Sequence, residues 1–194
     1  MTQLQRTFTR LEQCRIPVLV VVQGGCVGAG LDFVTACDCR YATKDSYFTN
    51  FETNLAMTAD VGTFPRICKL LPDGLVRELA YTGRALTAQE AKENGWVNQI
   101  FDTHDKLVEA VMNLATEMAS KAPMAIYGCK RMILHARDHR VSDTLDQVAL
   151  WNAGFFLKSD FADAMTANVQ KCAGSFTPFH LLAKDDEDNN LFSV

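Results

Sequence analysis

The chain has 194 residues, of which 48% are hydrophobic and 22% are charged, and this composition is typical of one compact globular protein. Its formal net charge is -4 and its Lys and Arg residues form no dense block, so neither nucleic acid nor an anionic membrane is expected as a partner. The longest strongly apolar run, Val18 to Val22, is far too short to cross a bilayer.

The cysteine content favours a reducing, intracellular environment. Seven cysteines are scattered among apolar runs, and an odd number leaves at least one unpaired within a monomer. Cys37 and Cys39 are separated by one residue, which is not the spacing of common zinc or redox pairs, so they are expected to be small buried hydrophobes. Residues 1–15 carry several charges and no long apolar core, so they do not look like a signal peptide.

The chain is predicted to open with a short amphipathic helix, in which Leu4, Phe8 and Leu11 fall at helical spacing. Residues 16–23 are an almost continuous β-branched run, which predicts a strand buried on both faces of a sheet. A glycine-rich turn then introduces an apolar helical stripe, so a helix is expected to begin inside it.

Two short strands are expected next, and the remainder is mostly helical. The strands fall at residues 39–43 and 47–51, with a further brief strand at 97–101. Helices are expected at residues 75–82, from the capping box Thr87–Glu90 to Gly95, at 107–118, at 123–137, from Ser142, and at 159–171.

The helix from Ser142 is too apolar for a solvated helix, so its apolar residues either complete the core or meet another subunit. These residues are Leu145, Val148, Ala149, Trp151, Phe155 and Phe156. The acidic run Asp185 to Asn190 is predicted to be a solvated, disordered tail. A calcium loop is the alternative, but the glycine at its bend and its closing glutamate are absent.

The glycine-rich segment Gly24 to Gly30 is the first candidate site, because it follows a strand and opens a helix. Glycine lets a backbone approach a ligand, and exposed N–H groups at a helix start can hold an anion or an oxyanion. A tight turn without a ligand is the alternative. The glycine spacing fits neither a P-loop nor the dinucleotide fingerprint.

Three acids near apolar residues form the second candidate site: Asp32, Glu52 and Asp60. Burial and neighbouring like charges push a carboxylate towards its neutral form, which suits proton transfer near neutral pH. The alternative is that Asp32 and Glu52 cap helices or pair with Arg40 or Arg66.

Other chemistries have less support. His135 and His139 share a helical spacing, but Ala136 stands where a zinc protease needs a glutamate, so no metal site is expected. The serines lack the context of a nucleophile elbow.

Two segments resemble the central signature of the crotonase superfamily of acyl-CoA enzymes. Ile16 to Asp32 reads IPVLVVVQGGCVGAGLD, and Ala36 to Ala42 reads ACDCRYA. The resemblance continues through Asp60–Thr63 and Ala88–Val97 to near Phe179. It implies an α/β fold in which residues 1–104 form a partial crotonase core, 105–180 a helical region used for trimer or hexamer assembly, and 181–194 the acidic tail.

In that family a CoA thioester lies with its carbonyl oxygen between two backbone N–H groups. The second of these matches Ala29, in the turn with Gly25 and Gly28. The family usually has glycine at this position, but only the main-chain N–H is used.

The acids favour the dienoyl-CoA isomerases within the superfamily, because their Asp-Glu-Asp pattern matches Asp32, Glu52 and Asp60. Hydratases usually have glutamate in place of Asp32 and glycine in place of Asp60. The resemblance implies a proton shuttle between Glu52, Asp60 and the acyl chain, with Asp32 as a buried supporting carboxylate. Which of Glu52 and Asp60 is the base stays open. No separate cofactor is implied, since CoA is part of the substrate.

Typical relatives carry a further segment ahead of the position of Met1, which supplies strands, part of the CoA pocket and the first oxyanion N–H. The chain is therefore expected to be an N-terminally truncated member with a half-built oxyanion hole. Three functions stay open: dienoyl-CoA isomerase, enoyl-CoA hydratase, and a catalytically impaired structural subunit. The expected compartment is mitochondrial or peroxisomal in a eukaryote and cytoplasmic in a bacterium.

Overall fold

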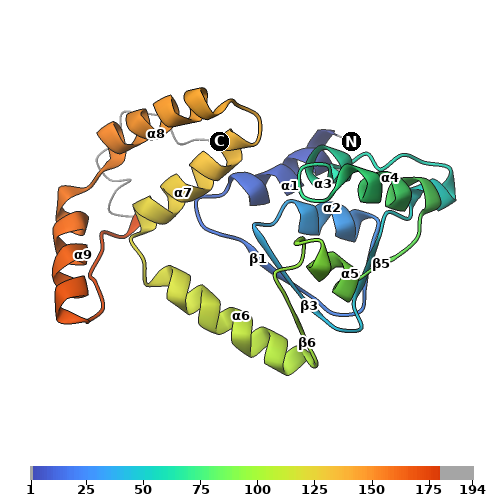
Figure 1. The fold of residues 1–194 in the computed structure, drawn as a ribbon, viewed down its shortest axis with the longest axis horizontal. Helices are drawn as coiled ribbons and strands as arrows, with labels where there is room; N and C mark the ends of the chain where they lie inside the picture. Colours follow the sequence, from blue (N-terminus) through green and yellow to red (C-terminus); the bar gives the residue numbers. More distant parts are fainter. Residues whose placement is uncertain (1, 180–194) are drawn as a thin grey trace. The chain divides into compact units, whose positions relative to one another are not determined.

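The structure, a computed structural model, describes residues 2–179 as two compact units (Figure 1). The first unit runs to Ala115 and the second begins at Thr116. This division falls within helix α6 (His104–Ala119), whereas the sequence places the boundary at the first residue of that helix. The acidic tail expected over residues 181–194 lies outside the described residues.

The first unit contains two small sheets, and the first four strands of the chain alternate between them. One sheet is parallel and has the order β1 (Leu19–Val22), β3 (Cys39–Thr43), β6 (Gln99–Phe101). The other has the order β2 (Gly25–Val27), β4 (Tyr47–Thr49), β5 (Leu86–Thr87), in which β2 is parallel to β4 and β5 is antiparallel to it. Within residues 2–179, β1 and β2 are therefore edge strands with one neighbour each.

Helices connect these strands and make up the second unit. The first unit contains α1 (Thr2–Gln13), α2 (Ala29–Thr35), the 3-10 turn η1 (Glu52–Leu55), α3 (Thr63–Ile67), α4 (Asp73–Thr82) and α5 (Ala88–Glu93). The second contains α7 (Pro123–Ala136), α8 (Val141–Phe155) and α9 (Lys158–Gln170). In the part of the chain that the structure describes, no helix has the length and apolar character needed to span a membrane.

The core of the first unit is built around Phe48 and Trp96, whose rings meet edge to face with centroids 4.7 Å apart. Leu31 of α2 and Leu79 of α4 belong to the same cluster. Arg40 is buried beside it, with its guanidinium over the Trp96 ring and its Nε donating to the Trp96 carbonyl at 2.9 Å. These contacts compensate for the loss of water around a buried charge.

Most of the predicted helices and strands are confirmed, with boundaries shifted by a few residues. Thr87 Oγ1 accepts a hydrogen bond from the Glu90 N–H at 3.1 Å, as the predicted capping box requires. Pro123 begins α7, where a proline costs no helical hydrogen bond.

The strand expected over residues 16–23 is shorter and less buried than predicted. β1 is an edge strand and its Val21 is 38% exposed, so the prediction of burial on both faces is wrong. Four short elements were not predicted: β2, η1, α3 and β5. Each has five residues or fewer, which is too short for the periodicity of apolar residues to reveal it.

The second unit leaves much of α8 exposed. Leu145 is 63% and Leu150 is 68% exposed, and no described residue of α8 is buried. The described residues therefore leave the outer apolar side chains of α8 uncovered, while Trp151 on the same helix packs against Tyr127 of α7.

Candidate active site

The candidate site lies where β2 and β4 end. These strands are parallel and paired in register, with Cys26 opposite Phe48, so the residues that follow them meet at one edge of the sheet. Gly28 follows β2 and Glu52 follows β4. The Gly28 N–H donates to the Thr49 carbonyl at 3.0 Å, which extends the pairing by one residue and fixes the two chain segments together.

Gly28 turns the chain from β2 into α2. Its φ of 55° and ψ of -118° are accessible to glycine and strained for other residues. A Cβ at residue 28 would lie 3.0 Å from Glu52 Oε1, so the absence of a side chain also lets the Glu52 carboxyl approach the backbone. Ala29 is the first residue of α2, and its N–H therefore has no carbonyl partner within the helix.

Glu52 brings an acidic group to this helix start. It is the first residue of η1, and its carboxyl oxygen Oε2 is buried with no hydrogen-bond partner among the described residues. A buried acceptor without a partner costs about 1 to 3 kcal/mol, which a protein tolerates where a ligand or a proton is to be bound. The combination of an N–H donor and an incompletely paired carboxyl is suited to proton transfer beside a bound carbonyl group.

Asp32 has a different environment from Glu52. It is 1% exposed, and one of its carboxylate oxygens accepts two hydrogen bonds. Its Oδ1 accepts hydrogen bonds from the Thr63 N–H at 2.6 Å and from Thr63 Oγ1 at 2.7 Å. Thr63 is the first residue of α3, so Asp32 caps that helix from the first turn of α2. The helix-capping alternative raised by the sequence therefore holds for Asp32.

Asp60 lies in the segment between η1 and α3, three residues before Thr63, and is half-buried. Its main-chain carbonyl accepts a hydrogen bond from Gln5 Nε2 at 2.6 Å. The Asp32–Thr63 contacts anchor the end of the same segment. The structure thus brings Glu52 to Gly28 and ties the Asp60 segment to α1 and α2.

Gly25 was expected in the oxyanion turn with Gly28 and Ala29 but lies in a strand. It is the first residue of β2 and pairs with Tyr47, and a Cβ at residue 25 would lie 2.6 Å from the Tyr47 hydroxyl oxygen. The Gly28 N–H is already bonded to Thr49, whereas the Ala29 N–H, at the first position of α2, has no partner within its helix.

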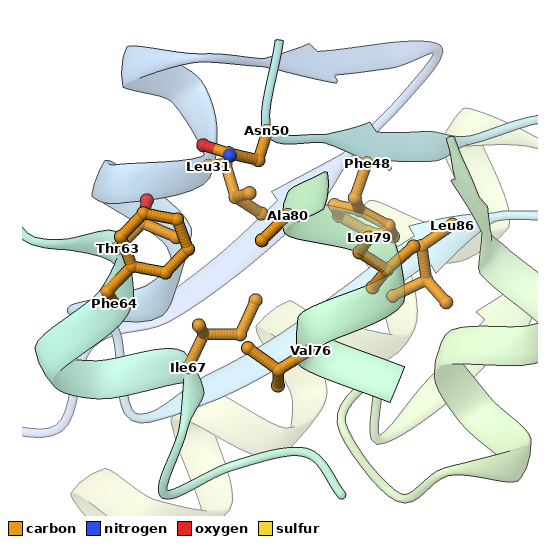
Figure 2. Close-up of a pocket in the computed structure, with 10 residues that line it drawn as sticks. All are labelled: Leu31, Phe48, Asn50, Thr63, Phe64, Ile67, Val76, Leu79, Ala80 and Leu86. Carbon is orange, nitrogen blue, oxygen red and sulfur yellow. The ribbon is translucent and has the colours of Figure 1, made fainter. Parts of the chain in front are cut away.

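Asn50 was not singled out from the sequence. It is 5% exposed, and both polar atoms of its side chain lack hydrogen-bond partners among the described residues. Its one signal in the sequence is that a polar residue stands between Phe48 and Phe51 where a strand ends. Asn50 lines a small apolar pocket of the first unit with Leu31, Phe48, Thr63, Phe64, Ile67, Val76, Leu79, Ala80 and Leu86 (Figure 2).

This pocket has a cavity volume of about 10 Å³, which is room for about one water molecule. Sites for organic ligands enclose about 300 to 1,000 Å³. This pocket is therefore too small for an organic ligand.

Two observations concern the Cys26 thiol and the possible metal ligands of the chain. Burial raises the pKa of Cys26 to about 12, so this thiol stays protonated at neutral pH and is a poor nucleophile. Among residues 2–179, no group of three or more His, Cys, Asp or Glu side chains is arranged to hold a metal ion.

Residues 1–177 match the family model described as enoyl-CoA hydratase/isomerase. The chain is 37% identical over 171 residues to the mitochondrial Delta(3,5)-Delta(2,4)-dienoyl-CoA isomerase of Mus musculus, which covers 88% of this chain and 52% of the relative. It is 36% identical over 168 residues to the peroxisomal Delta(3,5)-Delta(2,4)-dienoyl-CoA isomerase of Arabidopsis thaliana, which covers 87% of this chain and 60% of the relative.

A solved enoyl-CoA hydratase from Bacillus anthracis has a TM-score of 0.86 and 28% sequence identity, covering 90% of this chain and 67% of that one. The chain thus spans a little over half the length of the curated relatives named above. Because the family model matches nearly all of the described residues and the solved relative has the same α/β architecture, this chain belongs to the enoyl-CoA hydratase/isomerase family, whose fold is that of crotonase.

Proposed function

We propose that the chain is an isomerase that converts 3,5-dienoyl-CoA to 2,4-dienoyl-CoA in fatty-acid β-oxidation. The observation that carries this proposal is the Glu52 carboxyl group, which lies against Gly28 at the start of α2 and has one buried oxygen without a partner among residues 2–179. Asp60 supports it, because the reaction needs a second group to exchange a proton. Relatives that bear this activity in their names are 36% and 37% identical to the chain.

The proposed reaction removes a proton from C2 of the acyl chain and adds one at C6, while the two double bonds move by one position. Glu52 and Asp60 exchange these protons, one as base and one as acid. The Ala29 N–H, at the positive end of the α2 dipole, stabilises the negative thioester oxygen of the dienolate. The double bonds move without net oxidation, so no separate cofactor is needed and CoA enters with the substrate.

The test follows the ultraviolet absorbance of the conjugated 2,4-dienoyl-CoA product formed from a 3,5-dienoyl-CoA. Glu52→Gln and Asp60→Asn each remove one proton carrier, so each is expected to lower kcat by about 100-fold or more. Asp45→Asn changes an exposed acid outside the site and should retain the parent rate. An Asp60→Asn variant with the parent rate would contradict the proposal.

An enoyl-CoA hydratase is less well supported. That reading uses Glu52 and Asp32 to position water and does not need Asp60, but Asp32 Oδ1 already accepts both Thr63 hydrogen bonds. Hydration of a 2-enoyl-CoA that survives Asp60→Asn would favour the hydratase. Absence of both activities together with absence of CoA binding would favour a non-catalytic subunit.

The chain's own substrate, assembly and compartment are part of the proposal, since it spans a little over half the length of its curated relatives. We propose an acyl-CoA thioester as ligand and a homotrimer or homohexamer as the assembly. The two relatives are mitochondrial and peroxisomal by name, which supports the same compartments for a eukaryotic chain.

A further inference from the structure

The segment that carries Asp60 is held by hydrogen bonds on both sides of Val61. Gln5 Nε2 donates to the Asp60 carbonyl at 2.6 Å, and Arg66 Nη1 donates to the Gly62 carbonyl at 3.2 Å. The residue after Gly62 is held by the carboxylate cap of α3 described above. Residues 60, 62 and 63 are thus hydrogen-bonded to side chains of three different helices, α1, α3 and α2 respectively.

Arg66 connects this loop to α1. Its Nη2 lies 3.2 Å from Glu12 Oε2 and donates to Thr9 Oγ1 at 3.0 Å, while its Nε donates to Glu12 Oε2 at 3.2 Å. The Arg66 side chain is about nine-tenths buried, so solvent screens these contacts weakly. The planar guanidinium has enough donors to bind the α1 groups and the loop carbonyl at once, which the single ammonium of lysine does not match.

Gly62 is shaped to accept this contact. Its φ is +136°, and a Cβ at residue 62 would collide with Arg66 Nη1. The glycine therefore serves both the backbone conformation and the close approach of the guanidinium.

We propose that Arg66 is a positioning residue for Asp60, and that it and Gln5 fix the loop so that the Asp60 carboxyl faces the substrate in one orientation. This inference rests on the proposed role of Asp60 in proton transfer. Reactions of this kind are sensitive to position, since a displacement of about 1 Å can cost about 100-fold in rate.

Arg66→Met and Arg66→Lys test the inference through steady-state kinetics and amide hydrogen exchange of the full chain. Both variants are expected to lower kcat by about 10- to 100-fold with little change in KM, and to speed exchange at residues 60–62. The matched control is Arg84→Lys, because Arg84 is also a hydrogen-bonded, ion-paired arginine, but its partners Glu78 and Glu90 lie outside this loop. It should leave both readouts at the parent values.

Gln5→Met removes the other hydrogen bond to the same loop. Gln5 is exposed, so the substitution is not expected to prevent folding. Faster exchange at residues 60–62 and a lower kcat are expected, whereas Gln3→Met, on the exposed surface of the same helix, should change neither. If the Arg66 variants do not fold, the comparison of Gln5→Met with Gln3→Met decides whether these contacts position Asp60.

Unchanged exchange at residues 60–62 in the Arg66 and Gln5 variants would overturn the inference, and so would a loss of stability with no change in kcat. If the parent chain has no isomerase activity, the proposed function fails by itself. Hydrogen exchange then still decides whether Arg66 and Gln5 hold the loop.

Discussion

Asp32 illustrates how much one buried carboxylate contributes to the shape of the site. Asp32→Ala would leave the Thr63 N–H and hydroxyl without their acceptor, so the free energy of unfolding is expected to fall by about 3 kcal/mol. Asp32→Asn keeps a carbonyl oxygen at the same place and should cost about 1 kcal/mol. Urea unfolding of both variants measures the difference, and equal losses would contradict the capping role.

The Cys26 thiol makes stability depend on pH in the alkaline range. Its pKa rises from 9.0 to about 12 on folding, mainly because burial disfavours the thiolate and to a smaller extent because of Cys37. The unfolded chain therefore releases this proton first, so the contribution to stability is complete below pH 9 and is lost between about pH 9 and 12.

The expected slope from this residue is about 1.4 kcal/mol per pH unit in that range. Urea unfolding at several pH values measures it, with Cys26→Ala as the comparison. A parent chain and a variant with the same slope would show that Cys26 does not titrate in this way.

Single residues also show what sequence could and could not predict about the site. The three acids and the glycine turn were identified from residue types and from the resemblance to a known family. The family match confirms the resemblance. Their catalytic roles stay predictions. Asn50 and Gln5 were missed, because their importance comes from burial or from a contact over a long sequence separation. Neither property leaves a periodic signal along the chain.

At the scale of elements, the contact between α7 and α8 depends on a glycine. A Cβ at Gly128 would lie 2.5 Å from Trp151 Nε1, so α8 approaches α7 closely at this point. Tyr127 meets the same indole edge to face at 5.3 Å. Gly128→Ala is therefore expected to lower the free energy of unfolding by about 1 to 3 kcal/mol, because the Trp151 ring must move.

Gly154→Ala is the matched control, since Gly154 also lies in a helix but a Cβ there would have nothing within 4 Å. It is expected to raise stability by up to about 1 kcal/mol through helix propensity. Thermal or urea unfolding of both variants gives the comparison. A Gly128→Ala variant as stable as Gly154→Ala would contradict the close packing.

Elements were predicted well where periodicity is long and poorly where it is short. The helices α6 to α9 have ten or more residues each. They could be predicted from the spacing of their apolar residues or from the residues at their ends. β2 has three residues and lies within a glycine-rich segment, whose sequence predicts only a turn. Its pairing with β4 depends on a strand more than twenty residues away, and no local pattern predicts such a partner.

At the scale of the whole molecule, the second unit has large apolar side chains that the described residues leave exposed. Besides the α8 leucines, Phe156 is 53%, Phe161 is 53% and Val169 is 81% exposed. Several large apolar side chains exposed in one region are typical of interaction sites, which supports the proposed assembly through the helical region.

Leu145→Glu together with Leu150→Glu is expected to shift the chain towards monomers, because each substitution places a charge in the proposed interface. Light scattering coupled to gel filtration measures the assembly. The control is Glu109→Lys, which changes an exposed charge on α6 and should leave the assembly as in the parent. A doubly substituted chain with the parent mass would place the interface elsewhere.

The edge strands β1 and β2 have a further consequence. They are consecutive along the chain and border different sheets, so within residues 2–179 each has one side without a strand neighbour, and the bend at Gly24 links the two. A segment that pairs with β1 alone extends one sheet and leaves the β2 edge of the other sheet open. We therefore expect binding here to be bivalent: a bent unit of two strands would bind far more tightly than either strand alone, since the second pairing is intramolecular once the first has formed.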